Sequence, residues 1–247
     1  VTESTSNVGQ SYFSNNQFLN HSAVNPCFSL LSSMGKSKDF ASEFDFFAEE
    51  ERASLFDGLY PVTDGDSIVE VLNTKKPNVL LIMMEGFGGV FIEPLGGLSD
   101  VAPNLNRLSQ EGVFFTNCYA NSFRTDRGTV CTLSGYLGLP TASVMKIPAK
   151  SRTLPAISEE LVKAGYQTDF LYGGDINFTN MKSYLLSKGY QNLTADSDFS
   201  LAEQASNVWG VNDDITADWL LSQLKERNDG PWFTTYLTLS SHEPFDV

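Results

Sequence analysis

The chain has 247 residues, of which 41% are hydrophobic, and it carries a net charge of −14. A chain of this length can bury a substantial core, so we expect one large domain, alone or with an appendage. The negative charge argues against a non-specific nucleic-acid binder and against tight docking on anionic lipid through a polybasic patch, because both need a basic face. It is compatible with an acidic pocket for a divalent cation, and equally with surface solubility.

The cysteines and the ends of the chain give weaker indications. Cys27, Cys118 and Cys131 form no C-x-x-C pair, which argues against a zinc knuckle. Whether Cys118 and Cys131 pair in an oxidising compartment is not decided by their spacing. No stretch approaches the roughly 20 apolar residues of a membrane span, and the first residues do not form a signal peptide. The chain lacks an initiator Met, and we expect it to be part of a longer protein.

Residues 1–76 differ in character from the rest. They are rich in Ser, Asn, Phe and acidic residues, with no sustained strand pattern. A turn is expected at Asn25-Pro26 and a broken amphipathic helix over residues 38–52. Two interpretations stay open for this segment, an arm that packs on the main domain and a partly disordered linker.

From Lys76 onward, strand and helix patterns alternate, which predicts an α/β fold with a mostly parallel sheet flanked by helices. The expected strands are Val79–Met84, Val113–Cys118, Thr168–Tyr172 and Pro231–Leu239. The expected helices run from Ala102 to Gly112, Thr129 to Leu137, Leu154 to Lys163, Met181 to Leu186, and Asp213 to Leu224.

Polar side chains follow three of these strands. Glu85 follows the first strand, Asp175 follows the turn after Tyr172, and His242 follows the last strand. Because the carboxyl ends of parallel strands share an edge, these groups are expected to converge where open α/β sheets bind ligands. Each also has an ordinary explanation: a solvated Glu, a turn Asp and a core His. Three polar strand ends together favour a functional site.

The loop from Ser122 to Gly128 precedes a helix and carries a hydroxyl and two cations. Thr125 lies where helix amides and the helix dipole favour an alkoxide or a phosphoryl oxygen. A metal at Glu85 would lower the pKa of a coordinated Thr125 hydroxyl and activate it as a nucleophile. Arg124 and Arg127 are suited to bidentate contacts with phosphate. The alternatives are that Thr125 is an N-cap and that the arginines pair with Asp126 or with surface acids.

The ordered segments PNVLLIMMEGF, APNLNRL, GVFFTNCYANSFRTDRG, LYGGDINFTNM and TLSSHEPFDV resemble the lipoteichoic acid synthase family, within the alkaline phosphatase/sulfatase superfamily. The resemblance covers residue 77 to the end. It also extends to the preceding segment, which looks like the linker after the family's membrane domain. It therefore implies a linker over residues 1–76 and the N-terminal part of a sulfatase-like catalytic domain over residues 77–247.

The resemblance also implies roles for individual residues. In this family the glutamate that closes the first strand is a metal ligand, which points to Glu85. The nucleophile is a metal-bound threonine after a basic residue, matched by Arg124-Thr125. Thr129, one helical turn later, is a second candidate nucleophile.

Substrate contacts are implied for three of the residues. His242 matches the histidine that contacts the phosphate-bearing substrate. Arg124 and Asp175 are further substrate-binding candidates. Tyr172 stands at a turn where lipoteichoic acid synthases carry a His, so the headgroup is not specified.

Two further features bear on the reaction. The family's remaining metal ligands, an Asp-His pair, are expected downstream of this chain. The run from Cys131 to Gly135 is not the C/S-x-P-x-R motif of sulfatases, so sulfate ester hydrolysis is disfavoured.

Together these features predict a metal-dependent transferase of the cell envelope. It would move a phosphoglycerol-type group from a phospholipid donor to a glycan or lipid acceptor through a phosphothreonine intermediate. The cofactor implied is Mn²⁺, with Mg²⁺ as the alternative. The catalytic domain would be extracytoplasmic and anchored in the cell membrane by a preceding domain, with no nucleic-acid partner. The alternatives are a phosphodiesterase or phosphatase of the same superfamily, and a non-catalytic envelope protein.

Overall fold

The structure is a computed structural model that describes residues 6–14, 16–34, 39–59, 70–227 and 230–245. The chain divides into two compact units. The first comprises Val1–Val24 and Asn78–Val247, and the second Asn25–Pro77. The predicted division at residue 76, with a linker that follows a membrane domain, stays a prediction.

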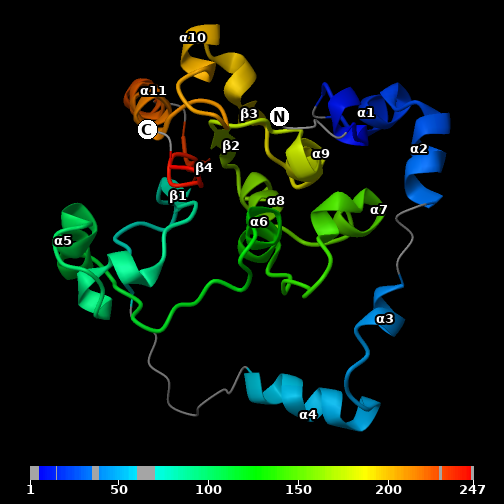
Figure 1. Cartoon of the computed structure of the whole chain (residues 1–247), viewed down its shortest axis with the longest axis horizontal. Helices are drawn as coiled ribbons and strands as arrows, with labels where there is room; N and C mark the ends of the chain where they lie inside the picture. The colour runs from blue at the N-terminus through cyan, green and yellow to red at the C-terminus, as the bar shows by residue number, and fades with distance from the viewer. Residues whose placement is uncertain (1–5, 15, 35–38, 60–69, 228–229, 246–247) are drawn as a thin grey trace. The chain divides into compact units, whose positions relative to one another are not determined.

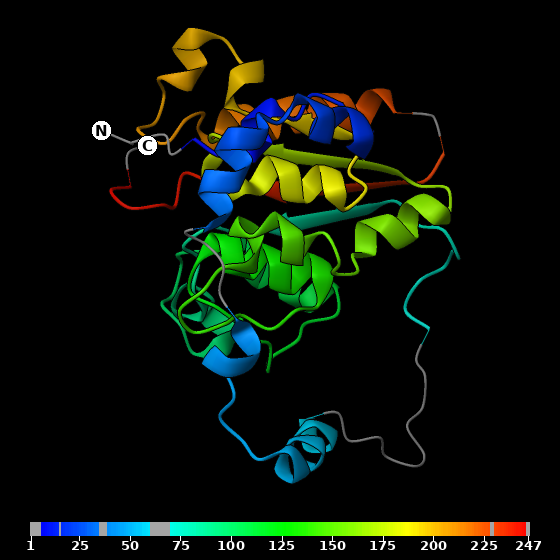
Figure 2. The same ribbon diagram turned by 90° about the vertical axis from the view of Figure 1, so that its right-hand side faces the viewer.

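The first unit contains a four-stranded parallel sheet, as the sequence predicts. Its strands are β1 (Val79–Met83), β2 (Gln167–Tyr172), β3 (Asn192–Thr194) and β4 (Trp232–Leu237), in the order β1-β4-β2-β3. Figure 2 shows β1, β4 and β2 running side by side in the same direction. Because Leu237 of β4 pairs with both Met83 and Tyr172, the carboxyl ends of these three strands are in line.

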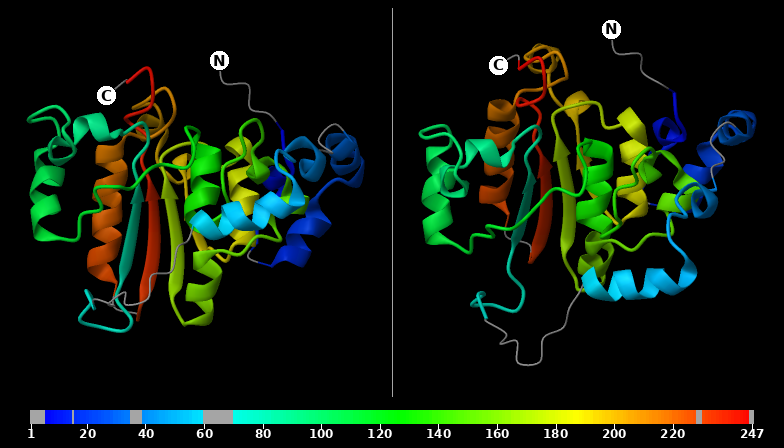
Figure 3. Two further views of the ribbon diagram at one scale, coloured as in Figure 1. Left: turned by 90° about the horizontal axis from the view of Figure 1, so that it is seen from below. Right: turned by 60° about the horizontal axis from the view of Figure 1, so that its bottom comes forward.

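Helices cover both faces of this sheet. On one side lies α11 (Asp213–Glu226); on the other lie α6 (Thr125–Ser134), α8 (Ile157–Lys163) and α9 (Met181–Ser187) (Figures 1 and 3). Leu171 and Tyr236 form a buried cluster with Leu220 of α11. Their neighbours Phe170 and Thr235 point to the opposite face, because successive strand residues alternate.

Shorter elements connect these parts. In the first unit they are η1 (Val8–Ser11), α1 (Gln17–Ala23), η2 (Gly89–Phe91), η3 (Glu93–Leu95), α5 (Pro103–Glu111), η4 (Val144–Lys146), α7 (Pro148–Ser151), η5 (Phe178–Asn180), η6 (Asp196–Asp198) and α10 (Leu201–Gln204). The second unit contains α2 (Pro26–Met34), α3 (Phe40–Glu43) and α4 (Glu49–Leu59). None of the helices in the described ranges is long and apolar enough to span a membrane.

Three expectations about the elements are corrected. The predicted strand Val113–Cys118 is irregular, and the side chains of Val113 and Phe115 are 62% and 73% exposed, so the run lacks the burial that stabilises a central strand. The helix expected from Thr129 begins earlier, at Thr125, and ends before Gly135, which adopts the left-handed conformation of a helix C-cap. The short strand β3 was not predicted.

Candidate active site

Two predicted site residues are in direct contact at the carboxyl edge of the sheet. The hydroxyl of Thr125 donates a hydrogen bond to Oε2 of Glu85, with 2.6 Å between the oxygens. Thr125 is the first residue of α6, and the N-cap position belongs to Arg124, whose side chain makes no capping bond. The N-cap alternative for Thr125 is therefore wrong. Its hydroxyl lies at the positive end of a ten-residue helix, where negative charge is stabilised.

The chain turns sharply after β1, and this turn orients Glu85. Gly86 has a φ of +60°, and a Cβ at this position would overlap the carbonyl oxygen of Ser241. Glycine therefore allows both the turn and the close approach of the two strand ends. The Glu85 N–H donates to the hydroxyl of Thr238 at 2.8 Å, which ties the end of β1 to the segment after β4.

His242 lies on the loop that follows β4. Its Nδ1 is 2.8 Å from the carbonyl oxygen of Glu243. Since a carbonyl only accepts, Nδ1 carries the proton, and Nε2 is the acceptor in the neutral ring. The ring packs on the indole of Trp209, at 4.6 Å between centroids, and the Trp209 N–H donates to the same carbonyl. The sequence interpretation missed Trp209, which carries no motif signal.

Asp213 fixes the start of this loop. Its two carboxylate oxygens accept the N–H groups of Leu239, at 2.7 Å, and Ser240, at 2.8 Å. Its own N–H donates to the hydroxyl of Ser240 at 2.8 Å. The sequence marks Asp213 only as the first residue of a helix, so this role was also missed.

Two cations flank the residue after Thr125. Asp126 is 2% exposed; Arg124 Nε lies 3.6 Å from one of its oxygens and Lys146 Nζ lies 3.5 Å from the other. The alternative that Arg124 pairs with Asp126 is thus observed, although the guanidinium stays half exposed. Lys146 was not singled out from the sequence.

The turn after β2 places Asp175 and Tyr172 near each other. Oδ1 of Asp175 accepts hydrogen bonds from the backbone and the side chain of Asn177, so Asp175 shapes its own turn. Burial and the negative charges of nearby Glu85 and Asp175 raise the pKa of the Tyr172 phenol well above its usual range. The phenol therefore remains a neutral O–H donor.

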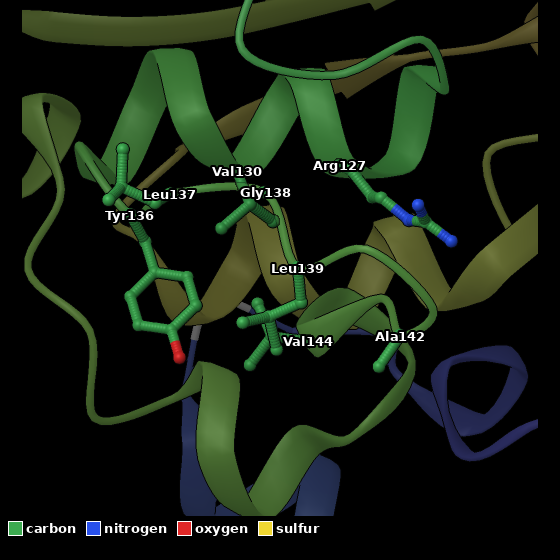
Figure 4. A pocket seen from close by; sticks show the side chains of 8 residues that line it. All are labelled: Arg127, Val130, Tyr136, Leu137, Gly138, Leu139, Ala142 and Val144. Atoms are coloured by element: carbon green, nitrogen blue, oxygen red, sulfur yellow. The ribbon is translucent and has the colours of Figure 1, made fainter. Parts of the chain in front are cut away.

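Arg127 has different neighbours from Arg124. It donates to the Pro140 carbonyl at 2.9 Å and lies over the Phe123 ring. Figure 4 shows it with Val130 of α6 at a small pocket. The remaining lining residues are Tyr136, Leu137, Gly138, Leu139, Ala142 and Val144. Since Arg127 is two residues beyond Thr125, it points to a different face of the helix.

Thr129 and the cysteines provide no additional reactive group at Glu85. Thr129 is 2% exposed, and within the described residues its hydroxyl has no hydrogen-bond partner. The three cysteines are free thiols, and Cys131 contacts the Asn121 side chain.

The donor set fits part of a divalent-cation site. Glu85 and Thr125 present a carboxylate and a hydroxyl oxygen, which are hard ligands of the kind that Mg²⁺ and Mn²⁺ prefer. In the described part of the chain, no three His, Cys, Asp or Glu side chains come together as a metal site. These two oxygens would therefore need further ligands.

The sulfatase family model matches residues 77–247. The chain belongs to the sulfatase family. Its relatives include the lipoteichoic acid synthase of Staphylococcus aureus (strain bovine RF122 / ET3-1), which is 25% identical over 181 residues, covering 70% of this chain and 27% of that protein. The N-acetylglucosamine-6-O-sulfatase of Bacteroides thetaiotaomicron is 30% identical over 98 residues, covering 38% of this chain and 17% of that protein.

A solved structure of an alkaline phosphatase superfamily protein from Vibrio parahaemolyticus has the same fold as this sulfatase-family chain. The TM-score is 0.63 at 31% identity, over 71% of this chain and 43% of that one. The predicted fold and the resemblance to lipoteichoic acid synthases within this superfamily are confirmed. The chain spans less than half the length of each of these relatives.

Proposed function

We propose that this chain is the nucleophile-bearing part of a metal-dependent phosphoryl-type transferase, with Thr125 as nucleophile. The observation that carries the proposal is the 2.6 Å hydrogen bond from Thr125 to Glu85 at the first residue of α6. A carboxylate acceptor and a helix N-terminus together favour a developing negative charge on the threonine oxygen. The similarity to a lipoteichoic acid synthase supports a phosphoglycerol-type donor.

The reaction proceeds in two displacements. Thr125 Oγ1 attacks the phosphorus of a phospholipid headgroup, forming a P–O bond to threonine and breaking the bond to the diacylglycerol oxygen, which takes up a proton. A hydroxyl of an envelope glycan or lipid then attacks the same phosphorus and releases threonine, which regains a proton. Arg124 and His242 are the candidates for orienting phosphoryl oxygens. Splitting one difficult step into two is the advantage of a covalent intermediate.

Glu85 and Thr125 would hold a divalent cation, Mn²⁺ or Mg²⁺, together with further ligands. When bound, such an ion stabilises negative charge on oxygen and favours the deprotonated hydroxyl. We further propose an extracytoplasmic location with a membrane anchor, which suits a lipid donor and an envelope acceptor.

The test is a hydroxyl deletion that preserves shape. In the full-length protein, Thr125→Val should lower kcat by at least about 1,000-fold, whereas Thr125→Ser should retain measurable turnover. Thr129→Val on the same helix is the matched control, and near-normal activity is expected because its hydroxyl has no partner in the described residues. Mass spectrometry of acid-quenched wild type should find the headgroup mass on the peptide containing Thr125. Full activity of Thr125→Val would refute the assignment.

Hydrolysis is the second candidate, because the relatives include a sulfatase. With water as acceptor, the product would form at the same rate whether or not an acceptor glycan or lipid is added. A transferase requires the acceptor for sustained turnover. A non-catalytic protein would show neither behaviour and would not bind Mn²⁺ or Mg²⁺.

A further inference from the structure

The buried carboxylate of Asp126 pairs with two cations. It is 2% exposed and follows the proposed nucleophile directly. Its oxygens lie 3.6 Å from Arg124 Nε and 3.5 Å from Lys146 Nζ, and no hydrogen bond within the described residues reaches Oδ2. Tight charge-assisted hydrogen bonds measure about 2.7–2.9 Å. Both ion pairs are therefore loose for a carboxylate buried this deeply.

The two cationic heads remain accessible. The side chains of Arg124 and Lys146 are 49% and 45% exposed, in contrast to the carboxylate between them. The two cations on this one carboxylate form a small cationic centre, and the Glu85 carboxylate, bonded to Thr125, is a further charge at the start of α6. This cationic centre stands out in a chain whose net charge is −14.

We propose that Lys146 and Arg124, held by Asp126, form the subsite for the non-bridging oxygens of the phosphoryl group that Thr125 attacks. The inference rests on the proposed function and names the group that it recognises, a singly charged phosphate diester. Asp126 is a positioning residue: its buried carboxylate pairs with both cations, and their half-exposed heads remain accessible to an anion. The amides at the start of α6 contribute to the same anion site.

Lys146 comes from η4, which is anchored by contacts away from the proposed site. The backbone carbonyl of Met145 accepts a hydrogen bond from the Asn180 side chain at 3.2 Å, and Met145 itself is fully buried. The head of Lys146 can therefore be changed without removing the packing that holds the segment. This separation makes a substitution at Lys146 informative.

The experiment compares Lys146→Gln, Lys146→Arg and Lys163→Gln in the full-length protein. Lys163 is the matched control, because Lys163→Gln also removes one positive charge. Lys163 ends α8 just before the amino end of β2, so it lies at the edge of the sheet opposite to the proposed site. Affinity for inorganic phosphate is measured by calorimetry, with and without Mg²⁺. The values of kcat and KM are measured with bis(4-nitrophenyl) phosphate.

Lys146→Gln should weaken phosphate binding and lower kcat/KM by about 10- to 100-fold, the range expected for one charged hydrogen bond to an anion. Lys146→Arg should recover both to within about threefold, and Lys163→Gln should stay within about twofold of wild type. If Lys146→Gln lowers the thermal midpoint but binds phosphate like wild type, Lys146 is only a structural partner and the inference is refuted. Absence of phosphate binding by the wild type refutes it as well.

The two proposals fail in distinguishable ways. A wild type that binds phosphate through Lys146 but has no diesterase or transferase activity contradicts the proposed function and leaves the anion subsite standing. An active wild type whose phosphate affinity and kcat/KM do not respond to Lys146→Gln contradicts the subsite alone.

Discussion

Replacement of Asp213 by Asn should loosen the loop that carries His242. The carboxylate accepts the N–H groups of Leu239 and Ser240 at 2.7 and 2.8 Å, one on each oxygen. An asparagine retains one acceptor and turns an NH₂ group toward the other N–H. One charge-assisted hydrogen bond is therefore lost and the other becomes neutral. At about 1.5–3 kcal/mol for each charged bond, the free energy of unfolding should fall by about 2–4 kcal/mol.

The assay is urea unfolding followed by circular dichroism, with the m-value checked for constancy. Asp214→Asn is the control, because Asp214 is exposed and lies in the same first turn of α11. Both aspartates interact favourably with the helix dipole, by about 0.3–1 kcal/mol, and both variants lose this interaction. The difference between their free energies of unfolding therefore isolates the hydrogen bonds to the loop. Equal losses in both variants would refute the reasoning, as would a loss below about 0.5 kcal/mol in Asp213→Asn.

Three further outcomes follow from single features of the fold. Gly86→Ala should destabilise the protein and reduce activity, because φ is +60° and the added Cβ meets the Ser241 carbonyl; unchanged thermal midpoint and kcat would contradict this. Lys188→Met should lower the free energy of unfolding in urea by about 3 kcal/mol, because the buried ammonium donates to the carbonyls of Arg152 and Leu154. An unchanged free energy of unfolding would mean that those carbonyls find other partners. Burial raises the pKa of three core tyrosines, Tyr184, Tyr190 and Tyr236. Their contribution to stability is complete below their ordinary pKa of 10.0 and is lost as pH rises from there through the raised values, by about 1.4 kcal/mol per pH unit for each tyrosine. Tyrosinate absorbance near pH 10 that accounts for all nine tyrosines in a still-folded protein would contradict this.

One predicted strand is absent and one observed strand, β3, was not predicted; both differences have the same physical cause. Val113–Cys118 has the composition of a strand, but Val113 and Phe115 are exposed and the segment is irregular. Strand propensity depends on a neighbour that provides hydrogen bonds and burial, and a sequence window contains no neighbour. Conversely, Asn192–Thr194 is polar and short, and it becomes β3 because it pairs with β2.

The local sequence was sufficient to place the main candidate residues at one edge of the sheet. The apolar run before Glu85 predicts a strand buried on both faces; the strand is present, but it lies at the edge of the sheet, where Leu80 and Ile82 are 38% and 50% exposed. Because the carboxyl ends of parallel strands share an edge, Glu85 and His242 were expected on that edge. The basic residue and hydroxyl before a helical segment pointed to Thr125. A shared metal site with Glu85 was what the family resemblance implied for Thr125; the structure shows the two side chains in direct contact, on a helix that begins four residues earlier than predicted.

The tertiary structure alone decided which distant side chains support those residues. The sequence does not connect Lys146 with Asp126, Trp209 with His242, or Asp213 with the loop after β4. Each of these contacts joins segments that different helices and loops bring to the sheet edge. The hydrophobic periodicity of a segment predicts which of its faces packs on the core. A contact between two distant loops depends on the path of both through space. The sequence therefore singled out Glu85 and Thr125 as candidates, and only the folded chain showed that they are in contact and which side chains surround them.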